Sequence, residues 1–107
     1  HPPFFTHEAM DLIVGNGVRH LLVDFPSIDR MFDEGKLNNH RKYWRLPPGG
    51  KSVTENSRID ASVTEMVYVP EELADGSYLL NLQFAPFASD AAPSRPLLYP
   101  VHRIDEV

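Results

Sequence analysis

The chain has 107 residues, a net charge of −5 and no cysteine. This length allows at most one ordinary domain, and we expect a single domain over residues 1–107. The acidic balance argues against a nucleic-acid binder, because phosphate contacts need a basic surface. No apolar run approaches the roughly 20 residues that span a bilayer, so we expect no membrane segment. The lack of cysteine excludes disulfides and zinc-thiolate sites, and it favours a cytoplasmic protein because small secreted domains usually rely on disulfides.

The first predicted element is a helix over residues 7–16. Thr6 can cap its start, and Gly17 can supply the left-handed residue that ends it. The segment VRHLLVDF, residues 18–25, follows at once and is apolar almost throughout. Such runs are typical of strands that are covered on both faces. A helix, a glycine stop and a buried strand in this order indicate an α/β fold.

A short helix is predicted within GKLNNHRKYW, residues 35–44. In this helix Leu37, His40, Arg41 and Trp44 would share one face, because they fall at i, i+3, i+4 and i+7. A histidine on a face anchored by leucine and tryptophan has two explanations. Either its ring nitrogens are satisfied locally in the core, or it is a metal ligand.

A carboxylate interrupts the next predicted strand, which covers residues 61–70. Side chains alternate between the faces of a strand, so Glu65 would lie in the centre of an apolar stripe. The other members of that stripe are Ala61, Val63, Val67 and Val69. A buried carboxylate costs several kcal/mol unless a cation accompanies it. That cation is either an arginine, with Arg41 and Arg58 as candidates, or a metal ion.

The remaining segments carry weaker signals. Residues 45–60 are expected to form a polar surface loop, and residues 77–86 and 96–101 two further strands, the second at an edge. Asp29 follows the first strand, where α/β proteins often place functional groups, but we expect it to cap a loop. The other histidines are expected to cap or to face solvent: His1, His7, His20 and His102.

Three segments, taken in order, resemble a known family. They are HPPFFTHEAMDLIVGNGVRHLLVDFPSIDR, LNNHRKYW and ASVTEMVYVPEELADGSYLLNLQFAPFASDAAPSRPLLY. Together they are similar to the C-terminal half of the cyclase family of metal-dependent hydrolases, which includes kynurenine formamidase and isatin hydrolase. The most specific features are V-D-x-P-S-I-D after the helix, a histidine-bearing segment, a glutamate-bearing strand and the closing DAAPSRP.

The resemblance implies a swivelling β/β/α barrel-like domain with a mixed sheet and flanking helices. It also implies that His40 and Glu65 are ligands of a divalent metal, Zn²⁺ or Mn²⁺. In the family, an upstream H-x-G-T-H-x-D-x-P-x-H motif supplies the other ligands and the acid/base histidine, and this chain lacks that motif. Asn38-Asn39-His40-Arg41 also stands where kynurenine formamidases have D-A-H-H. We therefore expect the C-terminal portion of a longer hydrolase.

The expected function is metal-dependent hydrolysis of a small amide, lactam or cyclic substrate, with this chain carrying part of the site. The expected partners are a small-molecule substrate, further copies of the chain in a homo-oligomer, and the missing N-terminal half. An alternative is a non-catalytic fragment or degenerate domain that acts in association or small-ligand binding. A third reading is a purely structural ion pair of Glu65, which would bind no metal.

Overall fold

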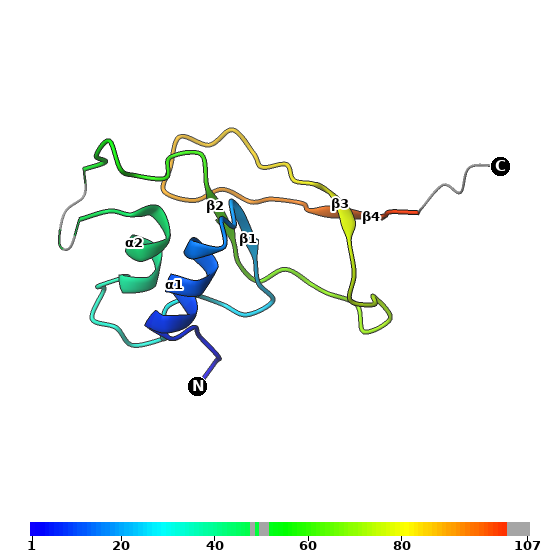
Figure 1. Ribbon diagram of the computed structural model, residues 1–107, viewed down its shortest axis with the longest axis horizontal. Coiled ribbons are helices and arrows are strands. Elements are labelled where there is room, and N and C mark those ends of the chain that lie inside the picture. Colours follow the sequence, from blue (N-terminus) through cyan, green and yellow to red (C-terminus); the bar gives the residue numbers. More distant parts are fainter. Residues whose placement is uncertain (48, 50–51, 103–107) are drawn as a thin grey trace. The chain divides into compact units, whose positions relative to one another are not determined.

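A computed structural model describes residues 1–47, 49 and 52–102 of the chain. These residues form an α/β structure with two helices and two small sheets (Figure 1). The chain divides into two compact units, His1–Tyr68 and Val69–Val107. Within the described residues, no helix is long and apolar enough to cross a membrane.

The first helix, α1 (His7–Gly15), begins and ends as the sequence predicts. The Thr6 hydroxyl accepts a hydrogen bond from the Ala9 amide at 3.1 Å, which satisfies one free N–H of the first turn. Gly17 adopts a φ of +75° just beyond the helix, a conformation that favours glycine. Met10 is fully buried on the inner face of the helix.

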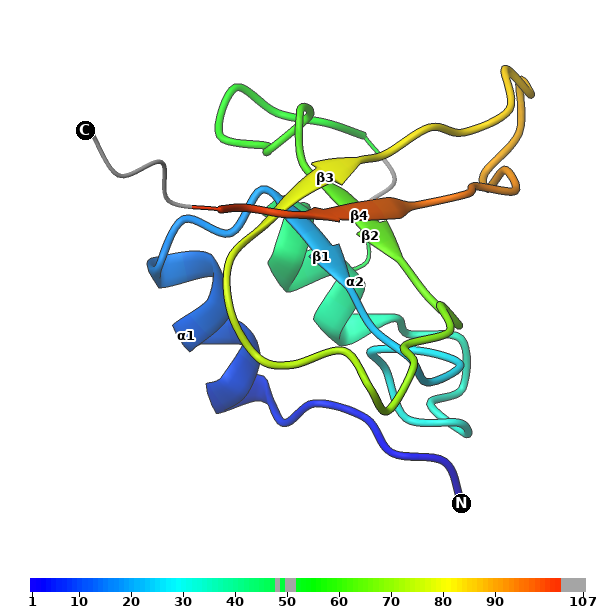
Figure 2. The same cartoon turned by 90° about the vertical axis from the view of Figure 1, so that its right-hand side faces the viewer.

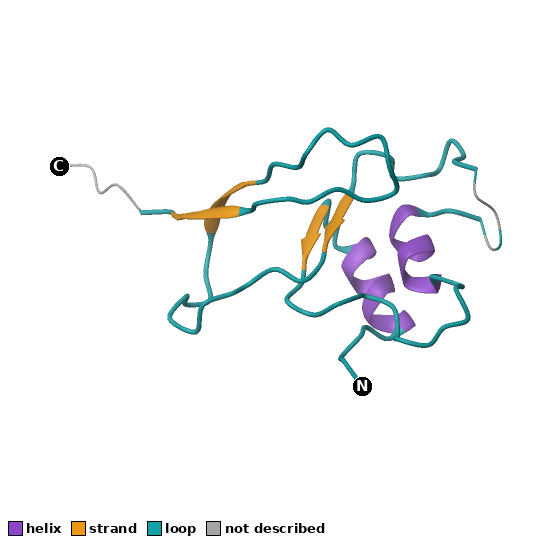
Figure 3. Cartoon of the chain, turned by 180° about the vertical axis from the view of Figure 1, so that it is seen from behind, coloured by secondary structure: helices purple, strands orange, loops and turns teal. Residues whose placement is uncertain are grey.

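Two short strands of the first unit pair in parallel: β1 (His20–Leu22) and β2 (Ser62–Thr64). Their register places His20 opposite Ser62 and Leu22 opposite Thr64. Both helices lie on one side of this pair, as Figures 1 and 3 show. The expectation of a strand covered on both faces was wrong, because His20 is exposed and Leu21 and Leu22 are only half-buried.

The second helix, α2 (Asn38–Trp44), differs from its prediction in the face that it buries. Leu37 adopts a φ of +51° before the helix and is 46 % exposed, so it does not belong to the inner face. Asn39 and Tyr43, four residues apart, are the buried residues instead. The core of the unit consists of four buried side chains: Met10, Val23, Ile28 and Tyr43.

The polar connection after α2 is tied to the core through Arg58. Its guanidinium donates to the carbonyl oxygens of Tyr43, at 2.8 Å, and of Val18, and it lies 4.7 Å from the centre of the Tyr43 ring. Arg58, one of the two arginines considered as a partner of Glu65, therefore binds backbone carbonyls and the Tyr43 ring instead. Positions 48, 50 and 51 of this connection lie outside the described residues.

The second unit is built on an antiparallel pair, β3 (Tyr78–Asn81) and β4 (Leu97–Pro100), which Figure 2 shows crossing the view. Tyr78 lies opposite Pro100 and Asn81 opposite Leu97. Both strands were predicted. Each is shorter than expected, and every residue of β4 is exposed.

Candidate functional site

Glu65 follows the last residue of β2 and does not lie at the centre of a strand. The strand ends at Thr64, and Met66 adopts a left-handed φ of +60°. The alternation of burial continues past the strand, since Glu65 and Val67 are half-buried and Met66 is exposed. Val69, predicted to share the stripe, is 48 % exposed. The predicted stripe therefore extends to Val67 and fails at Val69. Glu65 is turned inward, because its Oε2 accepts a hydrogen bond from the Ile28 amide at 2.8 Å.

His40 lies on the first turn of α2 between two carboxylates. Its Nδ1 is 2.6 Å from Asp29 Oδ2, and its Nε2 is 3.2 Å from Glu65 Oε2. The His40 side chain is 16 % exposed and that of Glu65 26 %. The fold thus brings together the two side chains that looked misplaced in the sequence.

Asp29 is the member of this group that sequence reasoning missed as a site residue. Its Oδ1 accepts from the Asn39 amide at 2.7 Å and its Oδ2 from the His40 amide at 3.2 Å, so it caps the start of α2 as well as binding the imidazole. Asp29 was predicted to cap a loop, whereas it caps the first turn of α2 and also binds the imidazole. The available signal was position, because Asp29 stands after a strand in an α/β pattern.

The charges of the three side chains support one another. Burial disfavours the imidazolium, but hydrogen bonds to Glu65 and Asp29 outweigh it and raise the pKa of His40 above its ordinary 6.5. Burial likewise opposes ionisation of Glu65, yet hydrogen bonds from His40 and the Ile28 amide lower the pKa of that carboxyl below 4.5. The arrangement therefore favours a positive charge between the two carboxylates.

A stacked aromatic ring covers the imidazole. The Trp44 ring lies 5.8 Å from that of His40 with an interplanar angle of 30°. Its indole N–H donates to the Ala61 carbonyl at 2.8 Å, which fixes the ring in place. This packing restricts the rotation of His40 and removes water from one face of the site.

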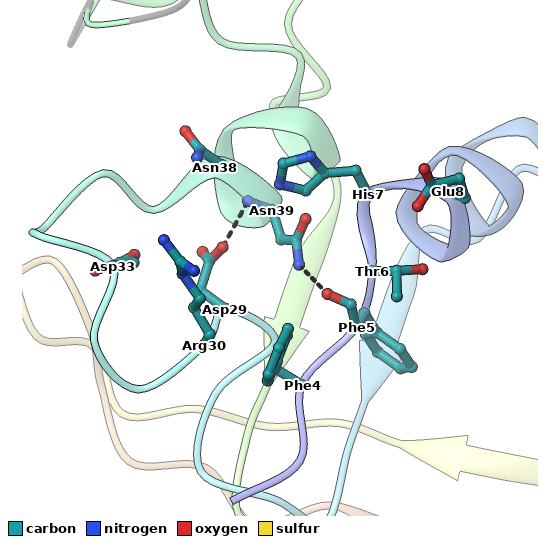
Figure 4. A pocket seen from close by; sticks show the side chains of 10 residues that line it. All are labelled: Phe4, Phe5, Thr6, His7, Glu8, Asp29, Arg30, Asp33, Asn38 and Asn39. Atoms are coloured by element: carbon teal, nitrogen blue, oxygen red, sulfur yellow. Dashed lines mark hydrogen bonds between the residues drawn. The ribbon is translucent and has the colours of Figure 1, made fainter. Parts of the chain in front are cut away.

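A cavity of about 330 Å³ lies between the N-terminal segment and the start of α2 (Figure 4). Asp29 is the residue that it shares with the group just described, while neither His40 nor Glu65 lines it. Asn39 lies in its wall, where its Nδ2 donates to the carbonyls of Phe5 at 2.7 Å and Ile28 at 2.8 Å. The full lining is Phe4, Phe5, Thr6, His7, Glu8, Asp29, Arg30, Asp33, Asn38 and Asn39.

Two donor atoms of the group have the chemistry and spacing of metal ligands. Imidazole nitrogen and carboxylate oxygen suit zinc and manganese, and two ligand atoms of a tetrahedral zinc lie about 3.3 Å apart. The observed separation of His40 Nε2 and Glu65 Oε2 is 3.2 Å. Within the described parts of the chain, no group of three or more His, Cys, Asp or Glu residues is arranged around one such point.

The other histidines contribute little to this site. His20 Nδ1 contacts the Ser62 hydroxyl at 2.8 Å, and His1 packs edge-on against Phe32. His7 lines the cavity of Figure 4. None of these three contacts involves His40 or Glu65.

Searches of family models, curated proteins and solved structures found nothing that matches this chain. The function is therefore inferred from the geometry of Asp29, His40 and Glu65 and from the sequence resemblance.

Proposed function

We propose that the chain is part of a metal-dependent hydrolase that acts on a small amide, lactam or cyclic substrate, with His40 and Glu65 as two of the metal ligands. The observation that carries this proposal is the convergence of His40 Nε2 and Glu65 Oε2, 3.2 Å apart, while Nδ1 is held by Asp29. A histidine whose second nitrogen binds a carboxylate is the common arrangement at zinc sites.

The two side chains would have distinct roles. Neutral His40 offers the Nε2 lone pair, and Glu65 offers a negative charge that offsets part of the charge of a divalent cation. When bound, such a cation lowers the pKa of its water toward about 7 and polarises a substrate carbonyl. The stacked Trp44 excludes water from one side and keeps the imidazole in its orientation.

Two donors are fewer than the three or four protein ligands that zinc sites normally use. We propose that an upstream half, similar to that of the cyclase family, supplies the remaining ligands and the acid/base histidine. In this reading the described α/β structure belongs to a larger swivelling barrel-like domain in a cytoplasmic homo-oligomer. Apolar side chains are exposed on the β3–β4 pair, where Leu79 is 65 % and Leu98 45 % exposed. A two-stranded sheet needs further packing to be stable, which supports the proposal that the rest of a larger domain or a second copy covers these strands.

A second candidate is a non-catalytic domain that acts in association or small-ligand binding. The same geometry favours it, because an imidazolium at His40 satisfies Asp29 and Glu65 without a metal. The raised pKa of His40 is the specific observation in its support. The two candidates differ in whether a metal ion displaces that proton.

The experiment is calorimetric titration of the metal-free chain with Zn²⁺ and with Mn²⁺, together with elemental analysis and intact mass of the purified protein. We expect one ion per chain, with binding lost in His40→Gln and in Glu65→Gln. His20→Gln is the matched control, because it removes an imidazole that hydrogen-bonds the Ser62 hydroxyl and, in the described structure, neither His40 nor Glu65. Binding that is unchanged in both site variants would exclude His40 and Glu65 as ligands. A wild-type chain that binds no ion, at an intact mass matching 107 residues, would restrict the metal function to a protein that also carries the upstream half.

A further inference from the structure

The segment Ser27–Asp29, which follows β1, contacts both proposed ligands. The Ile28 amide donates to Glu65 Oε2 at 2.8 Å, and Asp29 Oδ2 lies 2.6 Å from His40 Nδ1. We infer that Asp29 is the positioning residue of this site, which sets the tautomer of His40 so that Nε2 carries the free lone pair. This inference rests on the proposed function for its consequence, a metal affinity that depends on Asp29, but its structural part can be measured without a metal.

The Asp29 carboxylate is fixed in place by burial and by several hydrogen bonds. Its side chain is 6 % exposed, and Oδ1 accepts from the Asn39 amide at 2.7 Å while Oδ2 accepts from the His40 amide at 3.2 Å. Its own amide donates to the Ser27 hydroxyl at 3.1 Å. Rotating the carboxylate away from His40 would therefore break the start of α2.

Both ring nitrogens of His40 face a carboxylate, which can only accept hydrogen bonds. The contact of Nδ1 with Asp29 Oδ2, at 2.6 Å, is shorter than that of Nε2 with Glu65 Oε2, at 3.2 Å, so the single proton of a neutral ring belongs to Nδ1. In a neutral ring this leaves Nε2 without a proton, and Nε2 is the nitrogen that faces Glu65. Two acceptors at 3.2 Å repel each other unless they share a proton or bind the same metal ion. By holding the proton on Nδ1, Asp29 leaves the lone pair of Nε2 free to bind a cation.

The same segment fixes the second ligand. Ile28 is fully buried in the core, and its carbonyl accepts from Asn39 Nδ2 at 2.8 Å. Its amide is therefore a rigid donor to Glu65, and the Ser27 hydroxyl also binds that carboxylate and lowers its pKa. One short segment, Ser27–Asp29, thus orients two side chains that are far apart in sequence.

Asp29 could instead act as a helix cap alone. The variant Asp29→Asn distinguishes this role from the positioning of His40. Asparagine also caps helices well, because its Oδ1 can keep the bond from the Asn39 amide. Its NH₂ group would then take the place of Oδ2, give up the bond from the His40 amide, and donate to His40 Nδ1. The proton of the neutral ring would move to Nε2, which removes the lone pair that a metal needs, much as an Asp→Asn change in a serine protease triad gives the wrong tautomer.

The test is ¹⁵N NMR of the His40 ring in the metal-free chain at alkaline pH, followed by zinc titration of the same samples. We expect the Nδ1–H tautomer in the wild type, the Nε2–H tautomer in Asp29→Asn, and a 10–100-fold loss of zinc affinity in that variant. Asp33→Asn is the matched control, because the Asp33 carboxylate accepts from the Gly35 and Leu37 amides and makes no hydrogen bond with His40 or Glu65 in the described structure.

Several results would contradict the role of Asp29. An Nε2–H tautomer in the wild type would overturn the inference. This measurement uses the wild type alone, so it does not depend on whether a variant folds. An unchanged tautomer and zinc affinity in Asp29→Asn, or an equal loss of affinity in Asp33→Asn, would also overturn it. A wild type that binds no zinc, yet switches tautomer in Asp29→Asn, would leave Asp29 as the positioning residue and refute zinc binding by this chain on its own.

Discussion

Replacing Glu65 by glutamine tests the charge arrangement of the site through stability. The amide oxygen of the variant can keep the bond from the Ile28 amide, so mainly the negative charge next to His40 is lost. Hydrogen bonds to charged groups contribute about 1.5–3 kcal/mol and neutral ones about 0.5–1.5 kcal/mol. We therefore expect Glu65→Gln to lower the free energy of unfolding by about 1–1.5 kcal/mol when His40 is protonated.

The loss should depend on pH in a defined direction. The pKa of folded His40 is raised above 6.5, so its stabilisation is complete below 6.5 and is lost as the pH rises through the folded value. The pKa of folded Glu65 is lowered below 4.5, so its stabilisation is complete above 4.5 and is lost as the pH falls through the folded value. Both contributions coexist between pH 4.5 and 6.5.

Urea unfolding of the metal-free chain at about pH 5.5 and about pH 9 measures this dependence. The loss in Glu65→Gln should be largest at the lower pH. It should vanish at the higher pH, where His40 is neutral and the charge that Glu65 pairs with is gone. Glu55→Gln, an exposed carboxylate in the loop before β2, is the control and should change little at either pH. An equal loss at both pH values would refute the charge pairing of Glu65 with His40.

Three further predictions concern the core and the metal. Asn39→Ala leaves the carbonyls of Phe5 and Ile28 without their donor and should cost about 2 kcal/mol in urea unfolding, whereas an unchanged midpoint would contradict these bonds. Met10→Ala removes a fully buried side chain and should cost about 2–5 kcal/mol in the same assay, and a loss below 1 kcal/mol would mean that Met10 is not in the core. Added Zn²⁺ should raise the thermal midpoint of the wild type, and EDTA should reverse it, with no shift in His40→Gln; an equal shift in that variant would place the ion elsewhere.

The helix ends were the most predictable part of the fold. Thr6 and Gly17 act through local chemistry, a cap and a positive φ, and such signals need no knowledge of the rest of the chain. The face of α2 was not predictable in this way. Leu37 leaves the helix, and Asn39 is buried because two distant carbonyl groups require its NH₂, which no periodicity reveals.

Glu65 shows both the strength and the limit of reasoning from pattern. The alternation argument placed it at the centre of a strand, whereas β2 ends one residue earlier. The physical premise was nevertheless useful, because a half-buried carboxylate does need a partner, and His40 is that partner. The contribution of Asp29 depended on a contact between a loop and a helix that only the folded chain displays.

The stacking of Trp44 on His40 has a spectroscopic consequence. The chain contains a single tryptophan, so its indole emission comes from one place, against the proposed ligand. An imidazolium quenches indole fluorescence more strongly than a neutral imidazole does. The emission intensity of Trp44 should therefore change with the charge on His40. Fluorescence of the unlabelled protein can thus be used to follow protonation of His40 or metal binding to it.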